Sequence, residues 1–144
     1  MESKKISDTS VTMSQIMQPE DANVAGNVHG GTIMKLIDSA AGVVAVRHCR
    51  SNSVTASVDR IDFHNPAYIG DLLIIKASIN MAGKTSMEIG ARVETERLLK
   101  GDRYHIASAY LTFVSLDENL KPKQVPQLIL ETESEERRNQ EAQV

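Results

Sequence analysis

The chain has 144 residues, enough for one domain with a sizeable core, and a formal net charge of −3. It has no Trp, two Phe, three Tyr and no block of basic residues, which argues against nucleic acid as the main partner. Its single cysteine, Cys49, excludes an intrachain disulfide and fits a reducing compartment.

The ends of the chain carry no targeting or membrane signal. The first ten residues lack the apolar core of a secretory signal, and the longest uncharged apolar run, residues 39–46, is far shorter than the roughly 20 residues that cross a bilayer. We therefore expect a cytoplasmic protein with no membrane span. We also expect a disordered segment at 1–9, one domain at 10–125, and an acidic tail at 126–144 that is mobile or helical.

One long helix is predicted near the N-terminus. An alternating stretch at 11–17 predicts a first strand, and a loop rich in turn formers follows at 18–27. The helix should begin near Gly30 and end near His48. Its apolar residues cover nearly the whole circumference, which predicts a buried helix.

The sequence after the helix is typical of strands. Apolar residues alternate in four further runs, and turn-forming residues separate them. These runs are 53–63, 73–81, 87–96 and 107–113. The order predicts an α+β architecture in which a long antiparallel sheet of about five strands wraps around one buried central helix. A second copy of the sheet could extend this cover, which implies a dimer.

Two glycines, Gly30 and Gly31, mark the predicted start of the helix. They leave backbone N–H groups unshielded where the helix dipole adds partial positive charge. Such a site suits an anion or the developing oxyanion of a carbonyl addition. A tight turn or close packing explains the same pair, and on residue types alone this structural explanation is favoured.

Asp38 lies inside the predicted helix among apolar residues, where a carboxylate needs a partner or a catalytic role; a partly exposed surface charge is the alternative. Gly31 and Asp38 would lie about 10.5 Å apart along the axis, too far to act on one carbonyl carbon. If both are catalytic, the aspartate must come from a second copy across a two-fold axis.

Two further sets of residues bear on chemistry. Asn23, in the loop before the helix, could orient a water or donate to a carbonyl through its amide, or be an ordinary turn residue. The histidines at 29, 48, 64 and 105 and the single cysteine do not have the spacing of metal ligands, so no metal is expected.

Several ordered segments resemble the cytosolic acyl-CoA hydrolase type of hotdog thioesterase. They are residues 19–35, 38–42, 47–49, 54–63 and 84–89. The resemblance spans roughly residues 10–118 and is to a one-domain bacterial form. It implies a hotdog fold, hydrolysis of fatty acyl-CoA to fatty acid and CoA without a further cofactor, and dimers that can assemble as a hexameric trimer of dimers.

The resemblance also implies residue roles. In such enzymes a loop asparagine and a helix acid form the active site across the dimer, which assigns Asn23 and Asp38. The helix end with Gly31 would receive the thioester carbonyl. The remaining residues would bind the substrate and its CoA arm: His29, Gly30, Arg60, Lys84, Thr85 and Ser86. For His29, capping or packing is the alternative.

Two other functions stay open. A hotdog dehydratase for 3-hydroxyacyl thioesters would need His64 or His29 together with an acid, and would not need Asn23. A non-enzymatic acyl-CoA sensor would bind CoA without turnover. The ten residues before the first strand are too few for the helix-turn-helix unit that such sensors carry.

Overall fold

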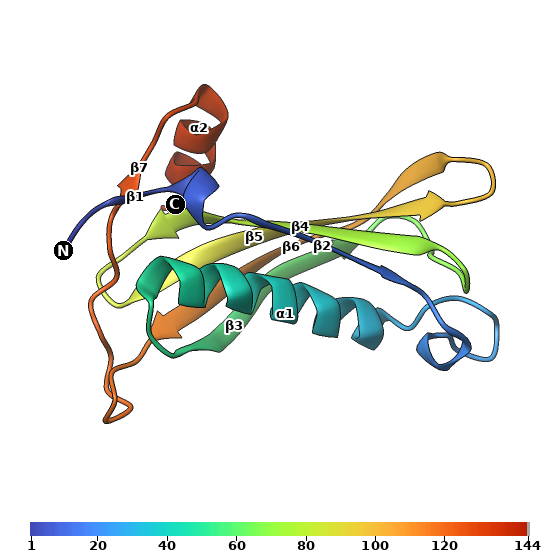
Figure 1. Ribbon diagram of the computed structural model, residues 1–144, viewed down its shortest axis with the longest axis horizontal. Coiled ribbons are helices and arrows are strands. Elements are labelled where there is room, and N and C mark those ends of the chain that lie inside the picture. Colours follow the sequence, from blue (N-terminus) through green and yellow to red (C-terminus); the bar gives the residue numbers. More distant parts are fainter. Residues whose placement is uncertain (144) are drawn as a thin grey trace.

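The computed structural model describes residues 1–143, in which a five-stranded antiparallel sheet lies against a long helix (Figure 1). The sheet has five strands in the order β2-β4-β5-β6-β3. Their bounds are β2 Val11–Ile16, β3 Ser53–Phe63, β4 Leu72–Ala82, β5 Ser86–Arg97 and β6 Asp102–Ser115. Helix α1, Gly30–Cys49, lies along one face of this sheet. The predicted α+β architecture is confirmed.

Helix α1 ends where Arg50 adopts a left-handed conformation with φ 51°. Its buried stripe packs on the sheet and consists of Ile33, Ile37, Ala40, Ala41, Val44, Ala45, His48 and Cys49. The expectation that the helix is buried all round is wrong for a single protomer, because Met34, Val43 and Val46 are each about 40% exposed. One sheet covers only one side of a helix, so the other side stays open.

Strand β3 is an open edge of the sheet. Among residues 1–143 it pairs only with β6, and its ladder has irregularities after Thr55 and after Val58. Val54 and Val58, which the alternation placed on one face of this strand, are both more than 40% exposed. The free edge of β3 therefore offers unpaired backbone groups and apolar side chains together.

The N-terminal segment differs from the expected disorder. Lys4–Lys5 forms strand β1, which pairs in parallel with β7, Leu128–Ile129, and a 3-10 helix follows at Ile6–Asp8. Ile6 is 5% exposed and belongs to the core. The Nζ of Lys4 donates to the carbonyl of His48, 2.6 Å away, at the end of α1. The segment is ordered because β7, which is distant in sequence, pairs with it. The periodicity of the sequence does not show such a pairing.

The acidic tail contains a second helix. Helix α2, Glu133–Ala142, begins after Thr132, whose side chain accepts from the backbone of Glu135. It lies over β4, where Asn139 donates to the carbonyl of Asn80 at 3.1 Å. No helix among residues 1–143 is long and apolar enough to cross a membrane.

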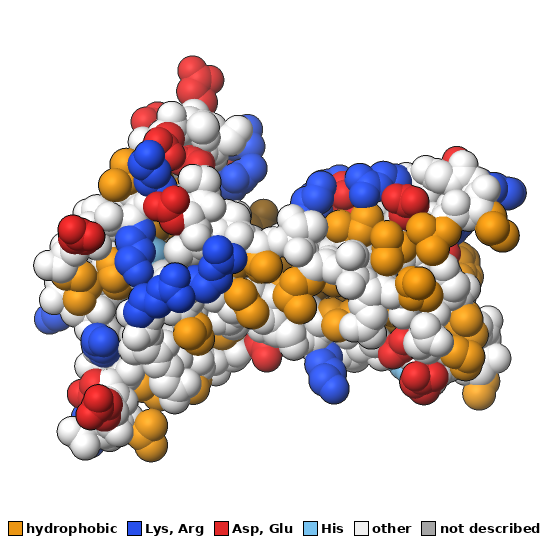
Figure 2. All heavy atoms as spheres, in the orientation of Figure 1, with side chains coloured by type: hydrophobic (Ala, Val, Ile, Leu, Met, Phe, Trp, Pro, Cys, Tyr) orange, Lys and Arg blue, Asp and Glu red, His pale blue; other side chains and the backbone are white. Residues whose placement is uncertain are grey.

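Apolar side chains are also exposed away from α1. Figure 2 shows them gathered at the end of the molecule that carries the β5–β6 hairpin. Leu98 and Leu99 lie at this hairpin and Tyr104 beside it; Leu99 is fully exposed. A single protomer thus leaves apolar surface uncovered in several places.

Candidate active site

A cavity of about 370 Å³ opens at the N-terminal end of α1. It brings together the loop before the helix, the first turn of the helix and the segment after β3. Its lining residues are Asn23, Asn27, Val28, Gly30, Ile33, Phe63, His64, Asn65, Pro66 and Ala67. The sequence-predicted residues Asn23 and Gly30 therefore share one cavity.

Asn23 is fixed by its own loop. Its side-chain oxygen accepts from the backbone N–H groups of Ala25 and Asn27 at 3.0 and 3.3 Å. This is the turn geometry expected of an asparagine in such a loop. The side-chain NH₂ has no partner within residues 1–143, so the amide can still donate to a ligand in the cavity.

The helix start is open. No side chain caps α1, and its first turn contains no acid. A Cβ added to Gly31 would meet no atom within 4 Å, whereas one added to Gly30 would lie 3.6 Å from the ring of Phe63. Close packing therefore does not explain Gly31. The first N–H groups of the helix remain available to an oxyanion.

His29 is the residue before the helix, and it is exposed. Its side chain makes no capping bond, so the capping alternative is wrong. Its backbone N–H donates to the carbonyl of Asp21 at 2.9 Å, which joins the loop to the helix start.

Asp38 does not line the cavity of Asn23. Its carboxylate is exposed on α1 and accepts a 2.6 Å hydrogen bond from the hydroxyl of Thr55 in β3. Thr55 is a polar residue that the sequence analysis missed. The available signal was a hydroxyl on the strand face opposite Val54 and Val58, but only the structure shows that this face lies toward the helix.

The residues expected along CoA are not gathered at this cavity within one protomer. Arg60 is exposed and paired with Asp62 at 2.7 Å. The carbonyls of Lys84 and Thr85 accept from the backbone of Val125 and Ser115, and Ser115 pairs with the first residue of β3. Ser86 begins β5 beside them. This end of the eleven-residue β3 lies roughly 35 Å of strand length from the end that adjoins Gly30.

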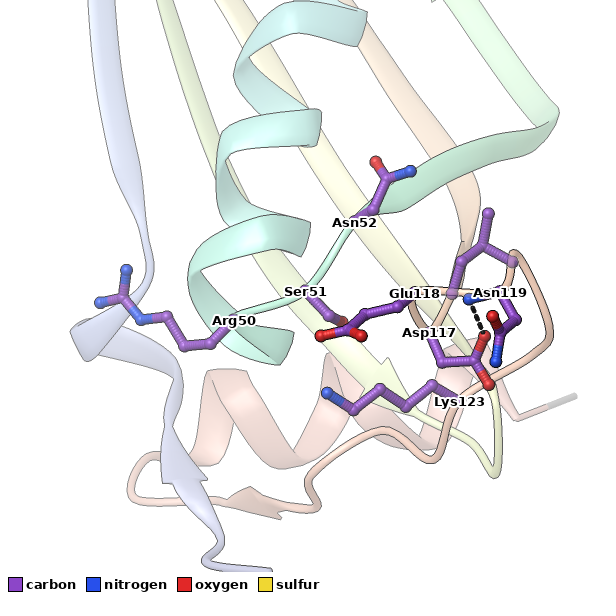
Figure 3. A pocket seen from close by; sticks show the side chains of 8 residues that line it. Arg50, Ser51, Asn52, Asp117, Glu118, Asn119 and Lys123 are labelled. Carbon is purple, nitrogen blue, oxygen red and sulfur yellow. Dashed lines mark hydrogen bonds between the residues drawn. The ribbon is translucent and has the colours of Figure 1, made fainter.

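A second cavity, of about 470 Å³, lies at the C-terminal end of α1 (Figure 3). The side chains of Glu118 and Lys123 extend along it, while Asp117 is used to close its own turn by accepting from the backbone of Asn119 at 2.8 Å. It contains none of the sequence-predicted site residues. Among residues 1–143 no group of three His, Cys, Asp or Glu could hold a metal ion.

Residues 25–101 match the family model of the thioesterase superfamily. The chain belongs to the thioesterase superfamily. The cytosolic acyl coenzyme A thioester hydrolase of Mus musculus is 41% identical over 142 residues, which cover 97% of this chain and 37% of that protein. The chain thus spans little more than a third of the length of the first curated relatives that it matches.

Solved thioesterase structures agree with the fold. A crystal structure of an apo hexameric acyl-CoA thioesterase has a TM-score of 0.96 at 36% identity and covers 99% of this chain and 92% of its own. The acyl-CoA hydrolase of Staphylococcus aureus, in complex with butyryl-CoA, CoA and CoA disulfide, has a TM-score of 0.90 at 33% identity, with 97% and 86% covered. The predicted hotdog fold of this superfamily member is confirmed.

Proposed function

We propose that the protein hydrolyses fatty acyl-CoA to fatty acid and CoA at sites that two protomers form together. The observation that carries this proposal is a divided site. One cavity holds the open start of α1 and the side-chain NH₂ of Asn23, unpaired within residues 1–143, and the exposed carboxylate of Asp38 lies elsewhere on the same helix. A two-fold pairing of protomers would join the two halves and give two equivalent sites.

The Staphylococcus aureus relative supports these roles. Its acyl-CoA hydrolase was also solved as three variants, with an asparagine, an aspartate or a threonine replaced by alanine. The spacing of these three positions in that protein equals the spacing of Asn23, Asp38 and Thr55 in this chain. We assign Thr55 to the site on this ground and on its bond to Asp38.

The mechanism follows from these placements. The open N–H groups at Gly30 and Gly31 polarise the thioester carbonyl. Asp38 from the second protomer either removes a proton from the attacking water or attacks the carbonyl itself to give a mixed anhydride. Asn23 orients the water or the carbonyl. In either route the oxygen of one water ends on the acyl carbon, directly or by hydrolysis of the anhydride, which frees Asp38 again. The C–S bond breaks, CoA leaves as the thiol with a proton that comes from this water, and the acyl group leaves as the carboxylic acid.

Assembly is part of the proposal. The open edge of β3 and the exposed stripe of α1 offer backbone and apolar surface for pairing with a second copy. A related acyl-CoA thioesterase was solved as a hexamer, so we expect a trimer of dimers here. Arg60 and the segment from Lys84 to Ser86 would then contact CoA from another protomer. We expect no metal or further cofactor, and a cytoplasmic location.

A dehydratase activity is the second candidate, because His64 lines the same cavity as Asn23. No acid lines that cavity in one protomer, and the relatives named above are hydrolases. We therefore expect no hydration of 2-enoyl-CoA by this protein.

The first experiment measures thiol release from acyl-CoAs of increasing chain length with the parent protein, Asn23→Ala and Asp38→Ala. The matched control is Asp102→Ala, an exposed aspartate at the start of β6. We expect both site variants to lose turnover while the control retains it. An active Asp38→Ala variant, or a parent that releases no thiol from any acyl-CoA, would contradict the proposal.

Mixing the two inactive variants tests the divided site. In a mixed dimer, one of the two sites combines an intact Asn23 with an intact Asp38. Refolding Asn23→Ala with Asp38→Ala in equal amounts should therefore restore about a quarter of the parent activity. If each protomer held a complete site, the mixture would stay inactive.

A further inference from the structure

The cavity at the start of α1 has one histidine ring in its lining, and a second histidine ring packs against the first. His64 follows β3 and lines the cavity with Asn23 and Gly30. Its ring centroid lies 4.5 Å from that of His105 in β6, with the planes tilted by 32°. His64 therefore lies against a ring from a strand of the sheet.

Strand β6 of the sheet fixes the positions of these two rings. The Nε2 of His105 lies 2.8 Å from the hydroxyl of Ser108 and 3.1 Å from the carbonyl of Ala107. The segment after β3 is tied to the same strand, because the backbone of His64 donates to Ile106 and the side chain of Asn65 donates to the carbonyl of His105, both at 2.8 Å. The position of His64 thus depends on β6.

The ring nitrogens of His64 are left without a protein partner in the part of the chain that the structure describes, residues 1–143. A neutral imidazole carries one donor and one acceptor. A peptide-like amide offers the matching acceptor and donor. The pantetheine arm of CoA contains two such amides, and it is the part of the substrate that follows the thioester.

We propose that His64 contacts the substrate by hydrogen-bonding an amide of the pantetheine arm, and that His105 is a positioning residue that holds the His64 ring. This inference rests on the acyl-CoA hydrolase function proposed above. His64 belongs to binding and not to bond breaking, so it acts on KM and not on kcat.

The surroundings of His105 favour the uncharged form of its ring. Burial lowers the pKa of His105, and Arg92 of β5 and the adjacent His64 act in the same direction, whereas the carbonyl of Ala107 and the carboxylate of Glu94 oppose them. His105 therefore stays uncharged into mild acid.

Four variants separate contact from positioning. His64→Ala should raise KM for acyl-CoA about five- to tenfold and leave kcat within about twofold, as expected for one lost hydrogen bond. His64→Gln keeps a donor and an acceptor, so it should have a KM close to that of the parent protein. His105→Ala should raise KM although His64 is intact, and His105→Phe should keep KM because a ring remains to stack against.

A substrate pair supplies the matched control. An acyl N-acetylcysteamine thioester carries one amide, and the ethanethiol ester of the same acid carries none. We expect His64→Ala to raise KM for the first ester and to leave KM for the second ester unchanged. An equal rise in KM for both esters, or an unchanged KM for acyl-CoA, would overturn the inference.

The failure of this inference is distinguishable from failure of the proposed function. A parent protein that releases no thiol from any acyl-CoA contradicts the function, whatever His64 does. In that case calorimetric titration with CoA, whose arm carries both amides, still tests the contact. We expect about five- to tenfold weaker binding by His64→Ala, and equal binding would overturn it.

Discussion

At Gly31, at the start of α1, one substitution should have opposite effects on stability and on activity. An added Cβ has open space around it, and alanine is a better helix former than glycine. We expect Gly31→Ala to keep or raise the free energy of unfolding by up to about 1 kcal/mol. In the site proposed above, the methyl group would still enter the place of the thioester carbonyl, so kcat should fall roughly 10- to 100-fold. Urea unfolding and thiol release measure the two effects, and full activity would exclude a site at this end of α1.

Thr55 reaches Asp38 through a single hydrogen bond of 2.6 Å. Thr55→Val keeps the shape of the side chain and removes that bond. A hydrogen bond to a charged group contributes about 1.5–3 kcal/mol, so we expect kcat to fall by roughly tenfold or more. Thr55→Ser, which keeps the hydroxyl, should stay close to the parent. If the valine and serine variants have equal kcat values, the hydroxyl does not hold the catalytic carboxylate.

The N-terminal segment is an element whose energetic role can be measured. Ile6 is buried in the core next to strand β1, which pairs with β7. Truncating a buried isoleucine to alanine removes about 2–5 kcal/mol of stability. We expect Ile6→Ala to lower the free energy of unfolding by that amount, and Ser7→Ala, at an exposed position, to change it little. If Ile6→Ala were as stable as the parent protein, the N-terminal segment would be disordered, as the sequence predicted.

His48 links the end of α1 to the tail of the chain. It is fully buried, and its Nε2 donates to the carbonyl of Pro126, 2.6 Å away. Burial lowers its pKa; the bond to Pro126 opposes this, and the charge of Lys4 adds to it. As the pH falls through about 6.5, His48 therefore takes up a proton in the unfolded chain while it stays neutral in the folded chain.

The free energy of unfolding should therefore keep its whole contribution from His48 above about pH 6.5. Below that pH it should fall by up to about 1.4 kcal/mol per pH unit, until the pH reaches the pKa of His48 in the folded chain. Urea unfolding between pH 7.5 and 5 measures this slope. His48→Gln, which cannot take up a proton, should flatten it. An equally steep slope in that variant would show that other groups cause the acid loss.

If each protomer contributes half a site, as proposed above, the whole molecule should be active only as an assembly. Val58 lies exposed on the open edge strand β3. We expect Val58→Arg to give monomers by sedimentation and to lose thiol release together with the dimer. Leu99→Arg, at the equally apolar β5–β6 hairpin, is the matched control and should keep the dimer. Active Val58→Arg monomers would contradict the shared site.

The sequence by itself determined the elements, because their signals are local. Alternation with period two placed the strands, and the glycines at 30 and 31 marked the start of α1. The seven-residue spacing of Gly31 and Asp38 already predicted that one site would need two copies if both residues are catalytic. The family resemblance was likewise contained in short ordered motifs.

Only the tertiary structure decided which distant groups meet. It placed Thr55 on Asp38, His64 on His105, and Ile6 in the core. It also showed that Arg60 and the segment from Lys84 to Ser86 lie away from the Asn23 cavity in one protomer. These outcomes depend on strand order and on which face of β3 lies toward the helix. Periodicity carries neither, because an alternating pattern identifies two faces without saying which one is covered.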